Sequence, residues 1–313
     1  MTRTRFGRPA RLILAATSVT VITTLVAAPG VSRAAGTMFY VSLGDSYSVG
    51  YQPSPVAGAT SGYTGVVAAA KGLQLENFGC GGATTSSILS VTGTCGTNGY
   101  GPPAATNVGP STPSETQIQA ADAFISANQG NIGLITVSIG GNDVTSCVSD
   151  PSPVNCVLGR LPSIKANVTT LVGDLRAALG PSGNKVPIIG VTYPDVILGQ
   201  WVNSGGTPTF PPSAANQNLA TISQLAFKSY INPALKAAYK TGKGKLVDVT
   251  KKTGAYTKLT HTTSITLAPF GSITVPKAVA QICNLTWYCQ LGNIHANTAG
   301  YTLIGNLIDA AVK

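Results

Sequence analysis

The stretch FYVSLGDSYS, residues 39–48, decides the fold of this chain. Its first five residues are apolar or aromatic apart from one serine, and the run stops at Gly44, which predicts a buried strand that ends in a tight turn. Open α/β sheets bind their ligands at the carboxyl ends of such strands. Ser46 lies in this turn, where the N–H groups of a following helix point at its hydroxyl. Gly-Asp-Ser is also a common capping turn, but the position suits a nucleophile.

Four more apolar runs follow along the chain, and amphipathic stretches lie between them. The predicted strands are residues 39–43, 73–78, 133–139, 186–192 and 245–249, and the predicted helices are residues 64–71, 115–127, 164–179, 219–239 and 299–312. Strands that are apolar almost throughout are buried on both faces, as in a parallel sheet. The alternation of strands and helices therefore predicts an α/β fold with a doubly wound, mostly parallel sheet.

The first 35 residues are predicted to be a secretory signal peptide. Four arginines and no acidic residue precede an apolar stretch at residues 12–28, and the small residues Ser32 and Ala34 suit the two positions that a signal peptidase reads. The alternative, an uncleaved anchor, is disfavoured because the stretch is short and contains several threonines and serines. The mature protein is therefore expected to be one domain at residues 36–313, secreted and extracellular.

The net charge of +10 overstates how basic the mature domain is. Five of the 20 basic residues lie in the first 35 residues, which leaves 15 basic against 10 acidic residues, or +5. These charges are scattered apart from five lysines between 240 and 252. We therefore expect no nucleic-acid partner, while transient contact with lipid surfaces stays open. A monomer is expected, since no exposed amphipathic seam stands out.

The six cysteines all lie in the predicted mature domain, in three locally spaced pairs. In an oxidising compartment this pattern predicts three disulfides, and six cysteines allow 15 pairings. We expect the sequential pairing, which is Cys80–Cys95, Cys147–Cys156 and Cys283–Cys289. A zinc site is not expected, because no Cys-x-x-Cys motif occurs and the chain has only two histidines.

Two loops carry residues whose role the sequence leaves open. Trp201 and Phe210 lie in a Gly- and Pro-rich loop, where they either line an apolar cleft or pack the loop against the domain. Residues 258–275 alternate apolar residues with threonine and serine, which predicts a small hairpin. His261 lies in this hairpin and is expected to be solvated and without a catalytic role.

Three further blocks lie where a strand meets a loop or a loop meets a helix, at residues 77–85, 138–143 and 292–301. In a doubly wound sheet such positions converge on one edge. Their residues suit acyl transfer, because a serine hydroxyl needs an imidazole base and the developing oxyanion needs aimed donors. His295 would be the base for Ser46, with activity rising across the ordinary histidine range between about pH 5 and 8. The N–H groups of Ser46 and Gly82 and the amide of Asn142 would be the donors.

Taken together, the four blocks resemble the SGNH hydrolases, also called the GDSL esterase/lipase family. The family's marker residues Ser, Gly, Asn and His fall, in this order, on Ser46, Gly82, Asn142 and His295. The resemblance implies a three-layer α/β/α sandwich around a parallel sheet of five strands over about residues 39–312. It also implies hydrolysis of carboxylic esters or lipids without a metal or other cofactor. The cysteine pairs and Leu285-Thr286-Trp287 resemble secreted actinobacterial members.

The sequence departs from the family pattern next to the histidine. The family usually has an aspartate three residues before it, but this chain has Gly292, and no carboxylate lies between Asp248 and Asp309. We therefore expect a Ser46–His295 dyad, with a backbone carbonyl near Gly292 orienting the imidazole. Two alternatives to an esterase or lipase stay open: a carbohydrate deacetylase of the same family, and a catalytically silent surface-binding protein.

Overall fold

The computed structural model describes residues 1–2, 36–53, 62–95, 110, 112 and 114–312. Residues from Thr37 onward form one compact unit. The predicted signal peptide lies almost entirely outside the described residues, so it stays a prediction.

A five-stranded parallel sheet lies at the centre of this unit, with the strand order β2-β1-β3-β4-β7. The strands are β1 (Phe39–Gly44), β2 (Gln74–Asn77), β3 (Ile132–Ser138), β4 (Ile188–Val191) and β7 (Lys245–Val247). Every predicted strand is confirmed, with its ends shifted by at most two residues. The first strand, β1, lies inside the sheet, between β2 and β3. The turn that contains Ser46 therefore follows the carboxyl end of an inner strand.

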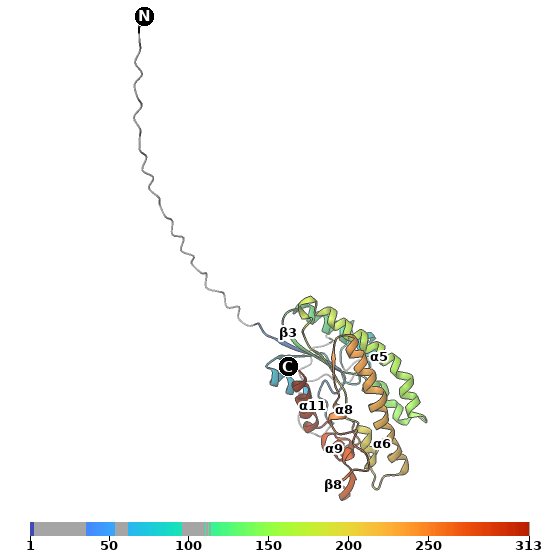
Figure 1. Ribbon diagram of the computed structural model, residues 1–313. Coiled ribbons are helices and arrows are strands. Elements are labelled where there is room, and N and C mark those ends of the chain that lie inside the picture. Colours follow the sequence, from blue (N-terminus) through green and yellow to red (C-terminus); the bar gives the residue numbers. More distant parts are fainter. Residues whose placement is uncertain (3–35, 54–61, 96–109, 111, 113, 313) are drawn as a thin grey trace. The chain divides into compact units, whose positions relative to one another are not determined.

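Helices cover both faces of the sheet, which confirms the three-layer α/β/α sandwich (Figure 1). Helices α1 (Gly62–Lys71) and α11 (Thr298–Ala311) pack on the face that carries Tyr40, Leu134 and Ile189. Helices α3 (Gln117–Ala127), α5 (Pro153–Ala178) and α7 (Asn232–Thr241) pack on the face that carries Val41, Ile135 and Ile188. Neighbouring strand residues thus point to opposite faces, and both sets are buried because both faces are covered.

The helix predicted over residues 219–239 is confirmed as a continuous helical stretch, but it contains a π-helical turn that was not predicted. Helix α6 (Ala214–Ala226) continues into a π-helical turn at Phe227–Ile231, and α7 follows. Pro233, in the first turn of α7, has no N–H to donate, and the wider turn lies just before it. Single π-helical turns often occur at functional sites, and Phe227 and Ile231 of this turn line the cavity described below.

Shorter elements connect the sheet and the large helices. They are α2 (Ser87–Ser90), α4 (Gly141–Val144), η1 (Thr145–Ser149), η2 (Pro181–Gly183), η3 (Val196–Trp201), β5 (Asn203–Ser204), β6 (Thr207–Pro208), α8 (Val249–Lys252), β8 (Thr262–Leu267), β9 (Gly271–Pro276), α9 (Lys277–Leu285) and α10 (Tyr288–Leu291). The predicted hairpin is confirmed as the antiparallel pair β8–β9, and His261 is exposed just before it. Trp201 and Phe210 pack against a separate apolar cluster, so they hold their loop down.

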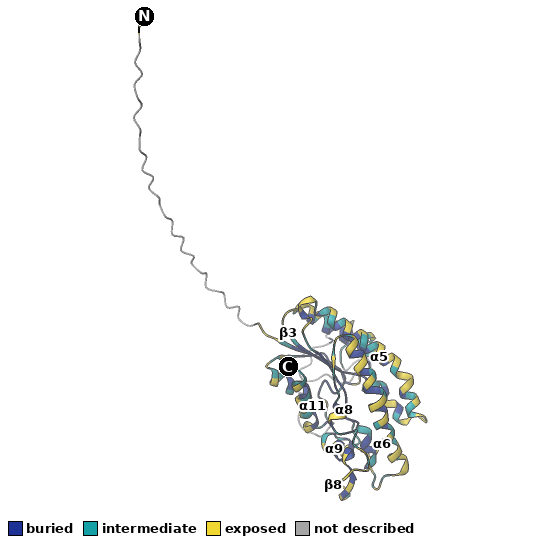
Figure 2. Ribbon diagram, viewed as in Figure 1, coloured by how far each residue is buried: buried dark blue, intermediate teal, exposed yellow. Residues whose placement is uncertain are grey.

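The three disulfides follow the sequential pairing, Cys80–Cys95, Cys147–Cys156 and Cys283–Cys289. The exposed residues of α5 and α6 lie on their outer faces, while their inner faces are buried (Figure 2). Among the described helices, none is long and apolar enough to cross a membrane.

Candidate active site

The turn that carries Ser46 is held from both sides at the carboxyl end of β1. The N–H of Asp45 donates to the carbonyl of Ser138 at 3.0 Å, and the N–H of Cys80 donates to the carbonyl of Gly44 at 3.0 Å. The side chain of Gln117 accepts from the N–H of Gly44 at 2.7 Å and donates to its carbonyl at 3.1 Å. Gln117 was not predicted from the sequence; the available signal was its place at the start of an amphipathic helix, among otherwise buried positions.

Two aspartates beside the site have structural roles. Asp45 is buried and accepts from the N–H of Tyr47 at 2.9 Å and from the hydroxyl of Tyr193 at 2.5 Å. Burial raises the pKa of Asp45 to about 7, against the opposing effect of these two hydrogen bonds. Asp143 accepts from the N–H and the hydroxyl of Thr85 at 2.9 and 2.6 Å, so it ties the Gly82 loop to α4.

Two of the three candidate oxyanion donors, Ser46 and Gly82, lie on loops, and the third, Asn142, lies in the short helix α4. Asn142 donates one amide hydrogen to the carbonyl of Ala83 at 2.9 Å, which places its side chain beside Gly82. Gly82 is exposed and has a φ of +75°, a backbone conformation that favours glycine. Within the described part of the chain, the N–H groups of Ser46 and Gly82 have no acceptor. Both are therefore free to receive a substrate oxygen.

The loop of His295 packs directly against the Ser46 turn. The hydroxyl of Tyr47 donates to the carbonyl of Ile294 at 2.7 Å, and the imidazole lies 5.8 Å from the ring of Tyr47 and 4.5 Å from that of Tyr51, measured between centroids. His295 Nε2 is buried and has no hydrogen-bond partner among the described residues, Ser46 included. The hydrogen bond between a catalytic base and its nucleophile is often long without substrate and shortens when the substrate binds.

The expectation that a backbone carbonyl near Gly292 receives the other imidazole nitrogen is wrong. His295 Nδ1 lies 2.7 Å from Oδ1 of Asn293 instead. Gly292 has a φ of +64°, and a Cβ at this position would lie 2.5 Å from Cα of Gly206. The position of the usual family aspartate is thus occupied by a left-handed glycine packed against the turn between β5 and β6, where no side chain fits.

The burial of His295 moves its expected titration. Removal from water lowers the pKa of the imidazole to about 4, because burial disfavours the charged form. If the neutral imidazole is the base, kcat/KM rises with pH through this value and is level above about pH 5, below the range expected from the sequence. The test is a pH–rate profile from pH 3 to 8, with folding checked at each pH by circular dichroism.

Asp45 is the other group of the site that titrates in this range, with its pKa of about 7. If kcat/KM still falls below about pH 4 in the Asp45→Asn variant, this fall is assigned to His295. A limb near pH 7 that this substitution removes would contradict the assignment.

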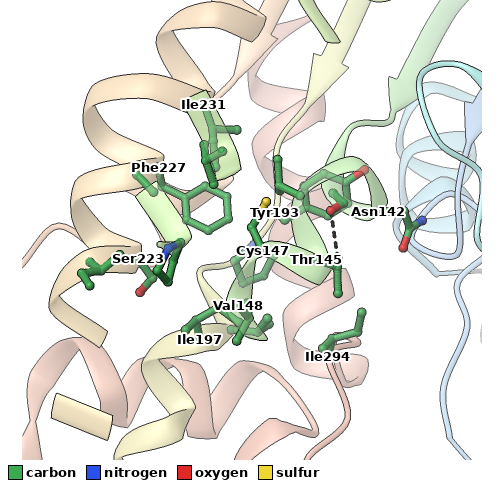
Figure 3. Close-up of a pocket in the computed structure, with 18 of the residues that line it drawn as sticks. Asn142, Thr145, Cys147, Val148, Tyr193, Ile197, Ser223, Phe227, Ile231 and Ile294 are labelled. Carbon is green, nitrogen blue, oxygen red and sulfur yellow. Dashed lines mark hydrogen bonds between the residues drawn. The ribbon is translucent and has the colours of Figure 1, made fainter. Parts of the chain in front are cut away.

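An apolar cavity opens beside Ser46. Its wall includes Ser46 and Asn142 at one end, followed by side chains of η1, α5, η3, α6 and the π-helical turn. The apolar side chains of this wall are Val144, Val148, Val157, Val196, Ile197, Leu219, Ile222, Ala226, Phe227, Ile231 and Ile294. Phe227 and Ile231 lie on the opposite side of the cavity from Asn142 (Figure 3). Among the described residues, no group of three or more histidine, cysteine, aspartate or glutamate side chains could hold a metal ion.

The model of the GDSL-like Lipase/Acylhydrolase family matches residues 42–303, which is most of the chain. The protein belongs to this family. The match includes all four marker residues, and membership makes this acylhydrolase a hydrolase that acts on esters. A comparison with curated proteins finds no matching relative.

The solved structures to which this chain is similar include lipases. The lipase Lip_vut3 from a goat rumen metagenome is 13% identical to this acylhydrolase, with a TM-score of 0.50, and the match covers 88% of this chain and 97% of that one. An extracellular lipase from Streptomyces rimosus is 21% identical with a TM-score of 0.37, covering 70% and 82% of the two chains. Phospholipase A1 from Streptomyces albidoflavus NA297 is 20% identical with a TM-score of 0.39, covering 88% and 98%.

Proposed function

We propose that this acylhydrolase is a secreted serine esterase or lipase that cleaves carboxylic esters with an apolar acyl chain. The apolar cavity next to Ser46 carries this proposal. A binding site for sugar hydroxyls would need several polar groups along its wall. Apolar side chains predominate here, although Asp45, Asn142, Thr145, Tyr193 and Ser223 also line the cavity. The cavity therefore favours a lipase-like substrate over an acetylated carbohydrate.

In the proposed reaction, Ser46 Oγ attacks the ester carbonyl carbon while His295 Nε2 takes the hydroxyl proton. The N–H groups of Ser46 and Gly82 and the Asn142 amide stabilise the negative charge that develops on the carbonyl oxygen. The C–O bond to the alcohol then breaks, and the imidazolium returns its proton to the leaving alcohol. Water, activated by the same imidazole, releases the carboxylic acid from Ser46 and completes the cycle.

The proposal of secretion rests on the predicted signal peptide together with the three disulfides. Disulfides persist in oxidising compartments and are rare in the reducing cytosol, and every cysteine of the chain is paired. Expression of the full chain in a secreting host, followed by sequencing of the N-terminus from the medium, tests it. Recovery of an intact N-terminus in the cell membrane would contradict it.

The dependence on acyl chain length tests the cavity as the acyl site. Each methylene that enters an apolar cavity contributes about 0.8 kcal/mol, or about fourfold in kcat/KM, until the cavity is filled. We expect kcat/KM to rise from acetyl to longer chromogenic esters by about this factor per methylene. A preference for acetyl esters over all longer chains would favour the deacetylase instead.

A substitution in the cavity wall adds a matched control to this series. Ala226 lines the cavity and is buried, while the next residue, Leu225, is exposed. Ala226→Trp is expected to lower kcat/KM for long-chain esters at least about tenfold and to spare acetyl esters, because the indole fills the space of several methylenes. Leu225→Trp should leave both unchanged. Thermal melts of both variants separate a filled cavity from a disrupted fold; equal losses on all esters in a folded Ala226→Trp protein would contradict the assignment.

A further inference from the structure

We propose that the amide oxygen of Asn293 positions His295, in the role that a carboxylate has in related hydrolases. This inference rests on the proposed function, in which His295 is the base, and adds a residue that the family pattern does not mark. This proposal is based on one amide oxygen that lies within hydrogen-bond distance of two nitrogens of the same residue. The backbone N–H and Nδ1 of His295 lie 3.1 and 2.7 Å from Asn293 Oδ1.

The backbone contact decides which amide atom is present at this point. The oxygen and nitrogen of an asparagine amide are told apart by their hydrogen-bond partners. A backbone N–H can only donate, so the atom 3.1 Å from it must be the acceptor, which is the oxygen. The amide orientation of Asn293 is therefore fixed independently of the imidazole.

The fixed oxygen in turn decides the tautomer of the imidazole. Because Oδ1 has no hydrogen, Nδ1 must carry the hydrogen of the 2.7 Å contact. The lone pair of the neutral ring then lies on Nε2, which is buried and without a partner among the described residues. This is the protonation state that a base for Ser46 needs. Asn293 thus holds the ring in its catalytic tautomer.

An amide oxygen differs from a carboxylate in one respect that can be measured. It orients the ring equally well, but it has no full negative charge to stabilise the imidazolium. Among the described residues, the titratable groups packed against the ring are the phenols of Tyr47 and Tyr51, and burial is what lowers the pKa of His295. A carboxylate placed at residue 293 would be the first opposite charge next to this imidazole and would raise its pKa.

The experiment uses the full mature protein labelled with ¹⁵N-histidine, in which the chain has only His261 and His295 to assign. At pH 7 the wild-type His295 should show a protonated Nδ1 and an unprotonated Nε2. Asn293→Ala should populate the other tautomer and lower kcat about 10- to 100-fold at unchanged KM, as expected for one lost hydrogen bond to a charged group. A wild-type His295 protonated at Nε2, or an unchanged tautomer in Asn293→Ala, would overturn the proposal.

Two further variants keep the test specific. Asn293→Asp should retain the protonated Nδ1 and move the acid limb of kcat/KM upward by about one to three on the pH scale, as an adjacent opposite charge does. Asn297→Ala is the matched control in the same loop: this side chain caps α11 by accepting from the N–H of Gly300 at 3.0 Å, so its loss should lower stability and leave the His295 tautomer unchanged. An acid limb in Asn293→Asp that coincides with the wild-type limb would count against the proposal.

The NMR result does not depend on turnover. A wild-type protein with the expected tautomer and no esterase activity would contradict the proposed function but leave the positioning by Asn293 intact. An active enzyme in which substitutions of Asn293 change neither the His295 tautomer nor the pH profile would contradict only the positioning.

Discussion

Replacing Ser46 by alanine is expected to lower kcat for ester hydrolysis by about 10⁴-fold or more, with little change in KM or in stability. The substitution removes the nucleophile and leaves the oxyanion donors and the cavity in place. Because Ser46 is only half-buried and its Oγ has no hydrogen-bond partner among the described residues, folding should be almost unaffected. The measurement is initial-rate kinetics on the best ester of the chain-length series, together with a thermal melt.

Ser48, two residues further along the same turn, is the matched control. Its hydroxyl donates to the carbonyl of Asp45 at 2.7 Å and is buried, so Ser48→Ala should cost about 1 kcal/mol of stability and retain most of the activity. The double variant Ser46→Ala, His295→Ala should be no slower than either single variant, because nucleophile and base act as one unit. Full activity in Ser46→Ala would leave the proposed mechanism without its nucleophile.

Gly44→Ala is expected to destabilise the fold by about 4 kcal/mol and to abolish activity with it. Gly44 has a φ of +132°, and a Cβ at this position would lie 2.0 Å from the carbonyl oxygen of Ser138 on the neighbouring strand. The cost combines a strained backbone with overpacking between β1 and β3, each of about 1–3 kcal/mol. For a domain of this size we expect a melting temperature lower by about 8–16 °C.

Gly72→Ala separates the two contributions. Gly72 has a φ of +62°, but a Cβ there would meet nothing within 4 Å. Its cost should therefore be that of the left-handed backbone alone, about 1 kcal/mol. Urea unfolding of both variants measures the difference. Equal losses of unfolding free energy in the two variants would mean that contact between β1 and β3 at Gly44 is not the constraint.

The candidate roles of Ser46, Gly82, Asn142 and His295 were all predicted from local patterns in the chain. Each follows an apolar run or precedes a helix, and the five strands and the three disulfide pairs were predicted from the same kind of pattern. Local patterns suffice here because strands buried on both faces and loops closed by nearby cysteines need only neighbouring residues to be recognised. The helix predicted over residues 219–239 is helical throughout, but its unbroken amphipathic pattern gave no sign of the π-helical turn within it.

The partners that hold the site in place come from far along the chain. Gln117 clamps Gly44 from 73 residues away, and Gly206 leaves no room for a side chain at residue 292. The apolar cavity likewise combines residues of α4, η1, α5, η3, α6 and the π-helical turn. Sequence pattern alone therefore determined the order of the elements and which residues could carry the chemistry. Only the tertiary structure decided that Ser46 opens onto an apolar cavity, because the cavity depends on how distant segments pack against one another. The contact between Asn293 and His295 is local, but it depends on the loop conformation, which the residue pattern does not specify.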